Sequence, residues 1–414
     1  MYVRPSALTA LTFAIESARK FEYPADRTLS YVLREQRVGS LDRPSVAEGY
    51  YAWLRHRMSV EAIAGDDAKT PVALALAALA RQYRRRVTVP AGEEDRYIKF
   101  LAIDEKLGPH ARRELPAWLW DRLGLQYGDE ERLALADSLL IAAPFDLRVN
   151  SLKAKRDVVL ERLKKEGFAD ARATTLSPVG IRLPNRVDIS RHPMFEDGTI
   201  EVQDEGSQML AQLVGAKRGE FVIDFCAGAG GKTLVMAAMM ASTGRLYALD
   251  VNDKRLDNLG PRLARSGASN VQSMRLETED DPKLNKFAGK ADRVLVDAPC
   301  SGLGTLKRNP DLKWRQSPTS VKELTEKQRA ILAAASRLVR PGGRLIYATC
   351  SLLAEENEKI AEHFLETNPG WAVVPSSLRG DDAEPEDVKR FATLLPHKDG
   401  CDGFFAAVFE RDGA

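Results

Sequence analysis

From about residue 201 to its end, the chain alternates short apolar runs with longer stretches of helical periodicity. Apolar runs of about 4–8 residues bounded by Gly or Pro are typical of buried strands. Strands that alternate with helices at this spacing predict an α/β fold with a doubly wound, mainly parallel sheet. The expected strands are Phe221–Phe225, Leu246–Asp250, Val271–Met274, Val294–Asp297, Arg344–Ala348 and Phe404–Phe409, and the expected helices are Lys232–Ala241, Lys254–Ser266, Leu324–Val339 and Glu355–Leu365.

The first 200 residues divide into two further parts. Residues 1–141 show apolar residues at helical spacing, interrupted by prolines, which predicts an all-helical domain. Residues 142–200 combine short strands with one helix, which predicts a small α/β module. Because 414 residues are too many for one typical core, we expect three domains, 1–141, 142–200 and 201–414. The expected elements before residue 201 are the helices Ala7–Arg19, Asp42–Met58, Val72–Arg86, Glu131–Ile141 and Lys155–Gly167, and the strands Phe145–Asn150 and Val179–Leu183.

The net charge of the chain does not by itself indicate a binding partner. The formal net charge is only +2, so any nucleic-acid surface must come from local clustering of basic residues. Two such clusters are Arg55-His56-Arg57 and Arg84-Arg85-Arg86. A solvated helix face is the more ordinary explanation of such a cluster, and contact with phosphates is the alternative.

The four cysteines, Cys226, Cys300, Cys350 and Cys401, lie far apart and form no CxxC pair. This spacing excludes a zinc ribbon and gives no disulfide framework, so we expect no metal site. Free thiols suit the reducing cytoplasm, where we expect the protein to reside. The longest apolar run, Pro71–Ala80, is too short to span a bilayer, and the amino terminus lacks the pattern of a signal peptide.

Two of the cysteines follow predicted strands at matching positions. The segment Asp297-Ala298-Pro299-Cys300-Ser301-Gly302 follows one apolar run, and Ala348-Thr349-Cys350-Ser351 follows another. Ligands bind at the carboxyl edge of open α/β sheets, where both thiols are expected. A free cysteine taken alone is most often a small buried hydrophobe. Two cysteines in matching turns, with a carboxylate beside the first, favour covalent chemistry instead.

A glycine-rich loop, residues 224–233 with the sequence DFCAGAGGKT, joins the first expected strand to its helix. A phosphate loop requires Gly where this chain has Cys226, and the dinucleotide pattern GxGxxG fails at Thr233. Asp250 closes the second strand, near the spacing of about 20 residues at which an acid meets ribose hydroxyls. Together with the polar motif after the fourth strand, the loop and this acid predict a site for S-adenosylmethionine.

These motifs resemble those of the RNA cytosine-5 methyltransferases of the Fmu/Sun family. The resemblance covers most of the chain and includes the glycine loop, the DAPCSG and TCS segments, and residues 203–208, 307–314 and 402–405. The helical part is similar to the NusB-like RNA-binding domain of the bacterial, RsmB-like branch that modifies ribosomal RNA. In the loop, Gly228 and Ala229 replace the Ala-Pro that is common in the family, and Asn309 stands where a His is common.

The resemblance implies a class I, Rossmann-like methyltransferase domain that uses S-adenosylmethionine to methylate carbon-5 of a cytosine in RNA. Cys350 would be the nucleophile that attacks carbon-6, Cys300 would assist release of the methylated base, and Asp297 would hold the base edge. The resemblance would place Glu277 in contact with the adenine of the cofactor, where the family usually has an Asp. The expected cofactor-binding residues are Cys226, Ala227, Gly228, Ala229, Gly230, Gly231, Lys232, Asp250, Glu277 and Asp297.

RNA, most simply small-subunit ribosomal RNA, is the expected partner of a chain that we expect to be monomeric. Transfer RNA is the alternative substrate, and an inactive RNA-binding assembly factor is the rival of another class. The presence of both cysteines and both aspartates argues against an inactive protein. Trp314 is expected either to clamp RNA or to pack in a core. The residues assigned to RNA contact are Arg148, Asn150, Lys307, Arg308 and Lys313.

Overall fold

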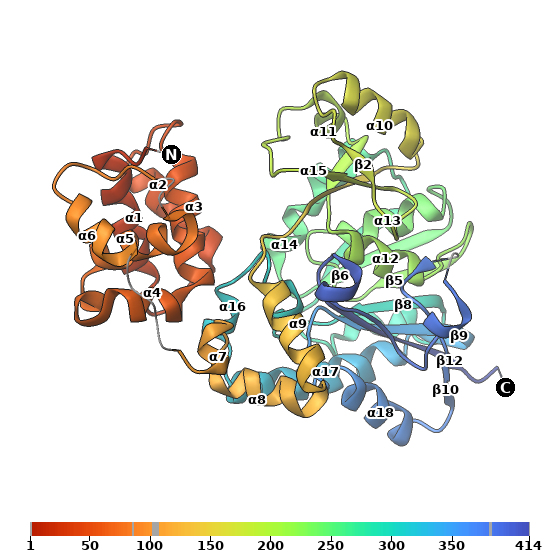
Figure 1. Cartoon of the computed structure of the whole chain (residues 1–414). Helices are drawn as coiled ribbons and strands as arrows, with labels where there is room; N and C mark the ends of the chain where they lie inside the picture. The colour runs from red at the N-terminus through yellow and green to blue at the C-terminus, as the bar shows by residue number, and fades with distance from the viewer. Residues whose placement is uncertain (1, 85–86, 102–106, 381–382, 414) are drawn as a thin grey trace. The chain divides into compact units, whose positions relative to one another are not determined.

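The computed structural model describes residues 2–84, 87–101, 107–380 and 383–413. The chain forms two compact units (Figure 1). The first, here called the helical unit, comprises Met1–Ala142 and Thr305–Pro318; the second, the sheet unit, comprises Ala143–Gly304 and Thr319–Ala414. The segment 305–318 thus belongs with helices that lie far from it in sequence. Among the described residues, no helix is both long and apolar enough to cross a membrane.

Helix α5 (Pro71–Tyr83) is the core of the helical unit. Every residue from Ala73 to Ala80 is buried, because α1, α3, α4 and α6 pack around it. A helix that is apolar on all sides is stable only when it is enclosed in this way. The helices of this unit are α1 (Pro5–Ala18), α2 (Ala25–Glu35), α3 (Arg43–Arg55), α4 (Arg57–Ala64), α5, α6 (Glu94–Leu101), α7 (Pro109–Arg112), α8 (Ala117–Gln126), α9 (Asp129–Leu139) and α16 (Leu312–Arg315).

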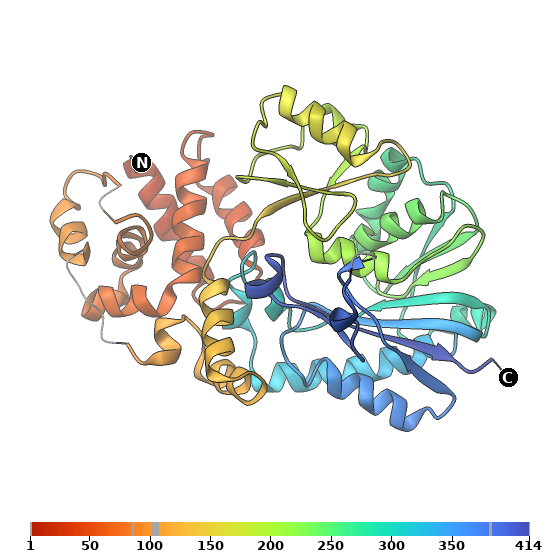
Figure 2. The same ribbon diagram turned by 45° about the vertical axis from the view of Figure 1, so that its right-hand side comes forward.

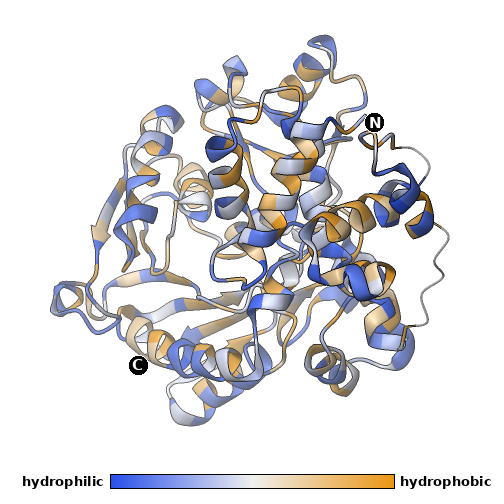
Figure 3. Ribbon diagram, turned by 90° about the vertical axis from the view of Figure 1, so that its left-hand side faces the viewer, coloured by the Kyte–Doolittle hydropathy of each residue, from blue (hydrophilic) through white to orange (hydrophobic). Residues whose placement is uncertain are grey.

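Two helices of this unit differ from the sequence-based expectation. The helix expected over Asp42–Met58 is broken at His56, whose φ of −117° and ψ of 32° are not helical. The helix expected over Val72–Arg86 is described as far as Tyr83, and Arg85 and Arg86 of the basic cluster lie outside the described residues. Coloured by hydropathy, individual helices carry both hydrophobic and hydrophilic residues, as expected for helices that cover a core (Figure 3).

A small antiparallel sheet opens the sheet unit. Its strand order is β2-β3-β1-β4, and β1 (Phe145–Val149) pairs with both β3 (Gly180–Leu183) and β4 (Ile200–Val202). Leu147 and Ile181 of this sheet pack with Leu163 of α10 (Arg156–Lys165) in a separate core. The remaining elements here are β2 (Arg172–Ala173) and α11 (Pro193–Glu196).

The large sheet confirms the predicted α/β class. Its strand order is β10-β12-β9-β8-β5-β6-β7, with β11 paired to β12. The five neighbouring strands β9, β8, β5, β6 and β7 all run parallel to one another. The last long strand, β12, runs antiparallel to β9. The strands are β5 (Phe221–Asp224), β6 (Arg245–Asp250), β7 (Val271–Arg275), β8 (Ala291–Asp297), β9 (Val339–Thr349), β10 (Trp371–Val374), β11 (Ala392–Leu394) and β12 (Phe404–Arg411).

Helices cover both faces of this sheet (Figure 2). Side chains alternate across a strand, so Val294 and Val296 of β8 enter one core with α17 (Pro318–Ser336) and α18 (Glu358–Thr367). Leu295 enters the other core, with α12 (Glu205–Leu213) and α13 (Gly231–Met239). A sheet buried on both faces requires continuous apolar runs, which is why these strands are visible in the sequence.

The structure adds elements that the sequence did not predict. Strands β10 and β11 at the sheet edge and helix α12 fall in segments without strong periodicity. The single helix expected over Lys254–Ser266 is two short helices, α14 (Asp253–Asp257) and α15 (Leu259–Ser266), separated at Asn258. Pro261 lies in the first turn of α15, where its missing N–H costs no hydrogen bond.

Gly304 should tolerate no side chain, because its backbone is enclosed by two other backbones. Its N–H donates to the Cys350 carbonyl (2.8 Å), its carbonyl accepts from the Gly403 N–H (2.8 Å), and an added Cβ would lie 2.3 Å from the Gly403 oxygen. We expect Gly304→Ala to lower the free energy of unfolding by about 1–3 kcal/mol, as overpacking does. Urea unfolding measures this loss.

Gly260→Ala is the matched control, because nothing lies within 4 Å of a Cβ added at that helical position. It should leave stability unchanged or raise it by about 0.5 kcal/mol, as a helical Gly-to-Ala change does. Equal unfolding curves for the two variants would show that the backbone at Gly304 can move aside.

Candidate active site

The two candidate thiols leave neighbouring strands at the same edge of the sheet. Strands β8 and β9 are parallel, and their register pairs Asp297 with Ala348. Cys300 and Cys350 follow these two positions by a few residues, and their sulfur atoms lie 3.5 Å apart. Both residues are partly exposed. The structure therefore brings together two cysteines that lie fifty residues apart in the chain.

The Cys300 thiol resists ionisation. The hydrogen bond with Cys350, followed by removal from water and by the nearby carboxylate of Glu356, raises the pKa of the Cys300 thiol well above its ordinary value. Cys300 therefore stays protonated and can donate a hydrogen bond to a thiolate at Cys350. A thiolate is the reactive form of cysteine, so a protonated Cys300 is suited to a supporting role beside the nucleophile.

An ion pair links the glycine loop to the first cysteine loop. Lys232, in the first turn of α13, places its Nζ 2.6 Å from an Oδ of Asp297, and both side chains are largely buried. Burial alone would lower the pKa of Lys232, but the charge and hydrogen bond of Asp297, together with Cys350, outweigh it and raise that pKa. Lys232 is therefore a cation held in place by its ion pair with Asp297.

The glycine loop turns sharply between β5 and α13. Gly228 and Gly230 have φ values of 56° and 78°, in the left-handed region that glycine adopts without strain. The Gly228 N–H donates to one Oδ of Asp250, and the Asn252 N–H donates to the other (both 2.8 Å). These bonds fix the Asp250 carboxylate at the end of β6 and leave each oxygen a second lone pair for a ligand hydroxyl.

Asp224 supplies a buried acceptor beside this loop. One carboxyl oxygen accepts from the Thr233 hydroxyl (2.7 Å), and the other has no hydrogen-bond partner among the described residues. Removal from water raises the pKa of Asp224 to about 7, although the Thr233 hydrogen bond opposes the shift. A buried polar atom without a partner is rare in native proteins and fits a site that a polar ligand completes. The residues present therefore fit the amino and ribose groups of S-adenosylmethionine.

Other residues assigned to the cofactor lie at the same sheet edge. Cys226 is partly exposed, and burial raises the pKa of its thiol well above the ordinary value, so it remains neutral. Glu277 follows β7 with a side chain that is 66% exposed and an oxygen 3.5 Å from Arg275. Its backbone N–H donates to the buried carboxylate of Asp281 (2.8 Å). Contact of Glu277 with adenine stays a prediction.

Arg148 and Asn150 correct the sequence-based assignment to RNA. Both side chains are buried, and both are used inside the sheet unit. Arg148 donates to the Gln203 side chain (2.6 Å) and to the carbonyl of Gly231 (2.7 Å), at the start of α13. Asn150 donates to the carbonyls of Gly198 and Ser266. The alternation of apolar and polar residues in β1 does not reveal that Arg148 is buried, because polar residues in a strand normally face solvent.

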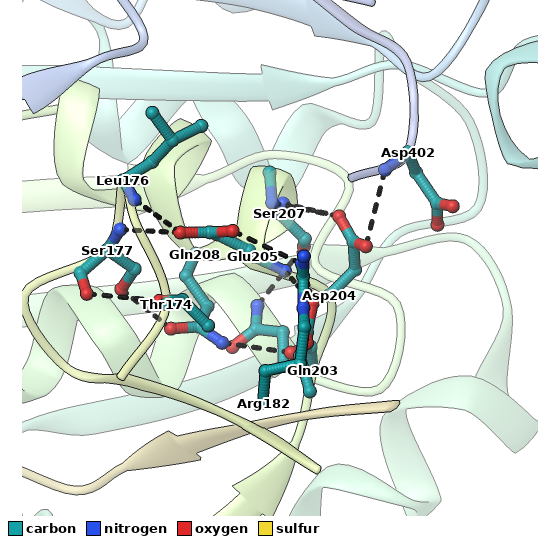
Figure 4. A network of polar contacts seen from close by, with 12 residues as sticks. Thr174, Leu176, Ser177, Arg182, Gln203, Asp204, Glu205, Ser207, Gln208 and Asp402 are labelled. Carbon is teal, nitrogen blue, oxygen red and sulfur yellow. Dashed lines mark hydrogen bonds and ion pairs between the residues drawn. The ribbon is translucent and has the colours of Figure 1, made fainter. Parts of the chain in front are cut away.

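A polar network ties this small sheet to α12 (Figure 4). The fully buried Glu205 accepts from the backbone N–H groups of Leu176 and Ser177 and from Arg182. Arg182 also forms a two-pronged ion pair with Asp146 of β1. Arg148 and this network together make the small sheet a support for the glycine loop.

The basic segment after Cys300 packs within the helical unit. Lys313 is 3% exposed and donates to the Arg55 carbonyl (2.9 Å), so the assignment of Lys313 to RNA is also corrected. Burial lowers the pKa of Lys313 to about 7, although Glu114 opposes the shift. Trp314 donates its indole N–H to the Leu54 carbonyl (2.8 Å), in agreement with the core-packing alternative.

The other two basic residues of this segment differ in exposure. Lys307 is buried in the helical unit, whereas Arg308 is only half-buried. Cys401 is buried, as expected for a cysteine outside the site. Within the described residues, no group of three or more His, Cys, Asp or Glu side chains could hold a metal ion.

Two family models match the chain. Residues 211–410 match the model described as 16S rRNA methyltransferase RsmB/F, and residues 115–190 match its ferredoxin-like domain. A protein of Synechocystis sp. named "Probable ribosomal RNA small subunit methyltransferase B" is 34% identical over 315 residues, which are 76% of this chain and 70% of the relative.

Solved structures share the fold. The crystal structure of PH0851 is 24% identical, with a TM-score of 0.82 over 99% of this chain and 100% of that one. A methyltransferase homologue from Pyrococcus horikoshii is 28% identical, with a TM-score of 0.63 over 74% of this chain and 100% of that one. The first comparison supports the architecture of the whole chain, and the second places it among methyltransferase folds.

The raised pKa of Asp224 should appear in the pH dependence of stability. Between pH 4 and 7 the unfolded chain ionises this carboxyl group while the folded protein keeps it protonated, so the free energy of unfolding falls as pH rises. Asp224→Asn has no carboxyl group to ionise at this position, so its free energy of unfolding should not fall in this way. Relative to wild type it should gain up to about 4 kcal/mol between pH 4 and 7, and nothing further above pH 7.

Urea unfolding of the ligand-free proteins at several pH values measures this difference. Asp257→Asn, on the exposed surface of α14, controls for the simple loss of one carboxylate and should follow wild type at every pH. A constant difference between Asp224→Asn and wild type would show that Asp224 is already ionised in the folded state at low pH.

Proposed function

The chain belongs to the RsmB/F family of 16S rRNA methyltransferases, and from this premise we propose that it methylates carbon-5 of a cytosine in RNA through a covalent bond to Cys350. The methyl donor of this family is S-adenosylmethionine, which supplies an electrophilic methyl sulfonium when it is bound. The residues that would hold it are Asp224, Asp250 and the loop from Cys226 to Lys232.

One observation carries the choice of carbon-5 chemistry: the 3.5 Å separation of the Cys300 and Cys350 sulfur atoms beside the Lys232–Asp297 ion pair. Methylation of an oxygen or an exocyclic nitrogen needs no protein nucleophile. Carbon-5 of cytosine is different, because it becomes reactive only after a nucleophile adds to carbon-6. A pair of thiols at the edge where the cofactor loop ends is suited to this addition and to its reversal.

Cys350 acts first. Its thiolate forms a bond to carbon-6, and the displaced electron pair increases negative charge at ring nitrogen-3 and electron density at carbon-5. The Lys232 ammonium lies within Coulombic reach of Cys350 and carries the charge opposite to that of the attacking sulfur. Together with Asp297 it presents one donor and one acceptor, which match ring nitrogen-3 and the exocyclic amino group of cytosine. Proton donation at nitrogen-3 is worth roughly 10²–10⁴-fold in rate.

Cys300 acts last. After methyl transfer the proton on carbon-5 passes to water, its bonding electron pair re-forms the carbon-5–carbon-6 double bond, and the sulfur–carbon bond breaks with its own pair returning to Cys350. Cys300 is in contact with that sulfur and assists this elimination. The target base must leave its stack to reach the thiols, as single-stranded or looped RNA permits.

We propose 16S ribosomal RNA as the substrate, because the family model names 16S rRNA and the Synechocystis relative is named a probable ribosomal RNA small subunit methyltransferase. Transfer RNA is the alternative. Bisulfite sequencing of both RNA classes from a strain that lacks the gene distinguishes them, since the lost 5-methylcytosine identifies the substrate. Loss of the mark from transfer RNA alone would overturn the ribosomal assignment.

The two cysteines should give opposite phenotypes. Cys350→Ala should abolish methyl transfer and form no covalent RNA complex, because the attacking atom is missing. Cys300→Ala should accumulate a covalent protein–RNA complex that survives denaturing electrophoresis, because release is blocked. The buried Cys401→Ala is a control that should behave as wild type in both assays. Full activity in Cys350→Ala would contradict the mechanism.

A further inference from the structure

A buried carboxylate lies behind both cysteine loops. Glu356 is fully buried, between β9 and α18. One of its oxygens accepts from the Ser301 hydroxyl and from the Ser351 hydroxyl, both at 2.5 Å. The other accepts from the Ser301 N–H (2.8 Å) and from the Gln328 side-chain amide (3.0 Å). Its partners are all donors, as an ionised carboxylate requires.

The placement of these partners is specific. Ser301 directly follows Cys300, and Ser351 directly follows Cys350, so each thiol loop is held at the residue next to its cysteine. The two serine hydroxyls also lie 3.1 Å from each other. Gln328 of α17 uses the same amide group to reach the Pro299 carbonyl (3.0 Å), so the first loop is held on both sides of its cysteine.

Neighbouring bonds fix Glu356 itself and the second loop. Its carbonyl accepts from the buried Tyr347 hydroxyl (2.6 Å). The adjacent Asn357 accepts from the Thr349 hydroxyl (2.6 Å) and donates to the Ser351 carbonyl (3.1 Å). Hydrogen bonds to an ionised group are about twice as strong as neutral ones, so one carboxylate can set the separation of two loops that leave different strands.

We propose that Glu356 is a positioning residue of methyl transfer, whose carboxylate clamps the Cys300 and Cys350 loops so that both thiols address one base. This inference rests on the covalent mechanism proposed above. Glu356 touches neither thiol by a hydrogen bond in this network and acts through Ser301 and Ser351. Reacting groups must be aligned closely, and a misplacement of about 1 Å can cost roughly 10²-fold in rate.

Glu356→Gln tests the clamp, because it keeps the shape of the side chain and replaces one acceptor oxygen by an amide donor. We expect kcat to fall roughly 10²-fold while the affinity for S-adenosylmethionine, measured by calorimetry, stays unchanged. Glu366→Gln, on the exposed surface of α18, is the matched control and should keep full activity. A kcat equal to that of the control would overturn the proposal. A parallel loss of affinity for the cofactor would also overturn it, because it would indicate general damage to the site.

A second experiment separates this proposal from the mechanism it rests on. In the Cys300→Ala background, the rate of covalent complex formation on unmethylated 16S RNA reports attack by Cys350 alone. Adding Glu356→Gln should slow this rate roughly 10²-fold. Equal rates with and without Glu356→Gln would overturn the clamp and leave the mechanism standing. No complex in Cys300→Ala itself would overturn the covalent mechanism, whatever the Glu356 variant does.

The serines provide a test that does not disturb the carboxylate. Ser301→Ala and Ser351→Ala should each lower kcat, and adding either change to Glu356→Gln should cost little more, because residues that act as a unit are not additive. If Glu356→Gln folds poorly, the Ser301→Ala and Ser351→Ala double variant takes its place. A shared clamp predicts that the loss of kcat in this double variant is smaller than the product of the two single losses. Strictly multiplicative losses would therefore contradict a shared clamp.

Discussion

The parallel pairing of β8 with β9 is the interaction on which the rest of the site depends. Their hydrogen-bonded register sets Asp297 beside Ala348, so two loops separated by some fifty residues begin side by side. Parallel strands end at the same sheet edge, and both cysteines are therefore delivered to one place. The apolar cores on the two faces hold this pairing, because Val294, Val296 and Leu295 are buried on alternate sides.

The same edge receives the glycine loop, because β5 is the other neighbour of β8. Lys232 at the start of α13 reaches Asp297 and joins the cofactor side of the site to the thiol side. Arg148 supports the loop from behind by donating to the Gly231 carbonyl. The buried cations at this edge are thus each held by a partner, as charges in a low-dielectric interior must be.

Polar residues were the hardest to interpret from the sequence. Arg148, Asn150 and Lys313 have the chemistry of RNA ligands, yet the fold buries them and satisfies their donors with carbonyl groups. Glu356 was overlooked for the opposite reason, since a glutamate near a helix start ordinarily faces solvent. Burial of a charged side chain depends on donors from distant segments, such as Ser301 and Gln328, which no local pattern records.

The sequence by itself determined the α/β class, the strands that end at the site, and the motifs carrying Cys300, Cys350 and the glycine loop, because doubly buried strands and tight turns leave local signatures. Only the tertiary structure decided the 3.5 Å approach of the thiols, the Lys232–Asp297 pair and the placement of 305–318 with the helical unit. Those features arise from packing and hydrogen bonds between segments far apart in the chain, and these segments meet only in the folded protein.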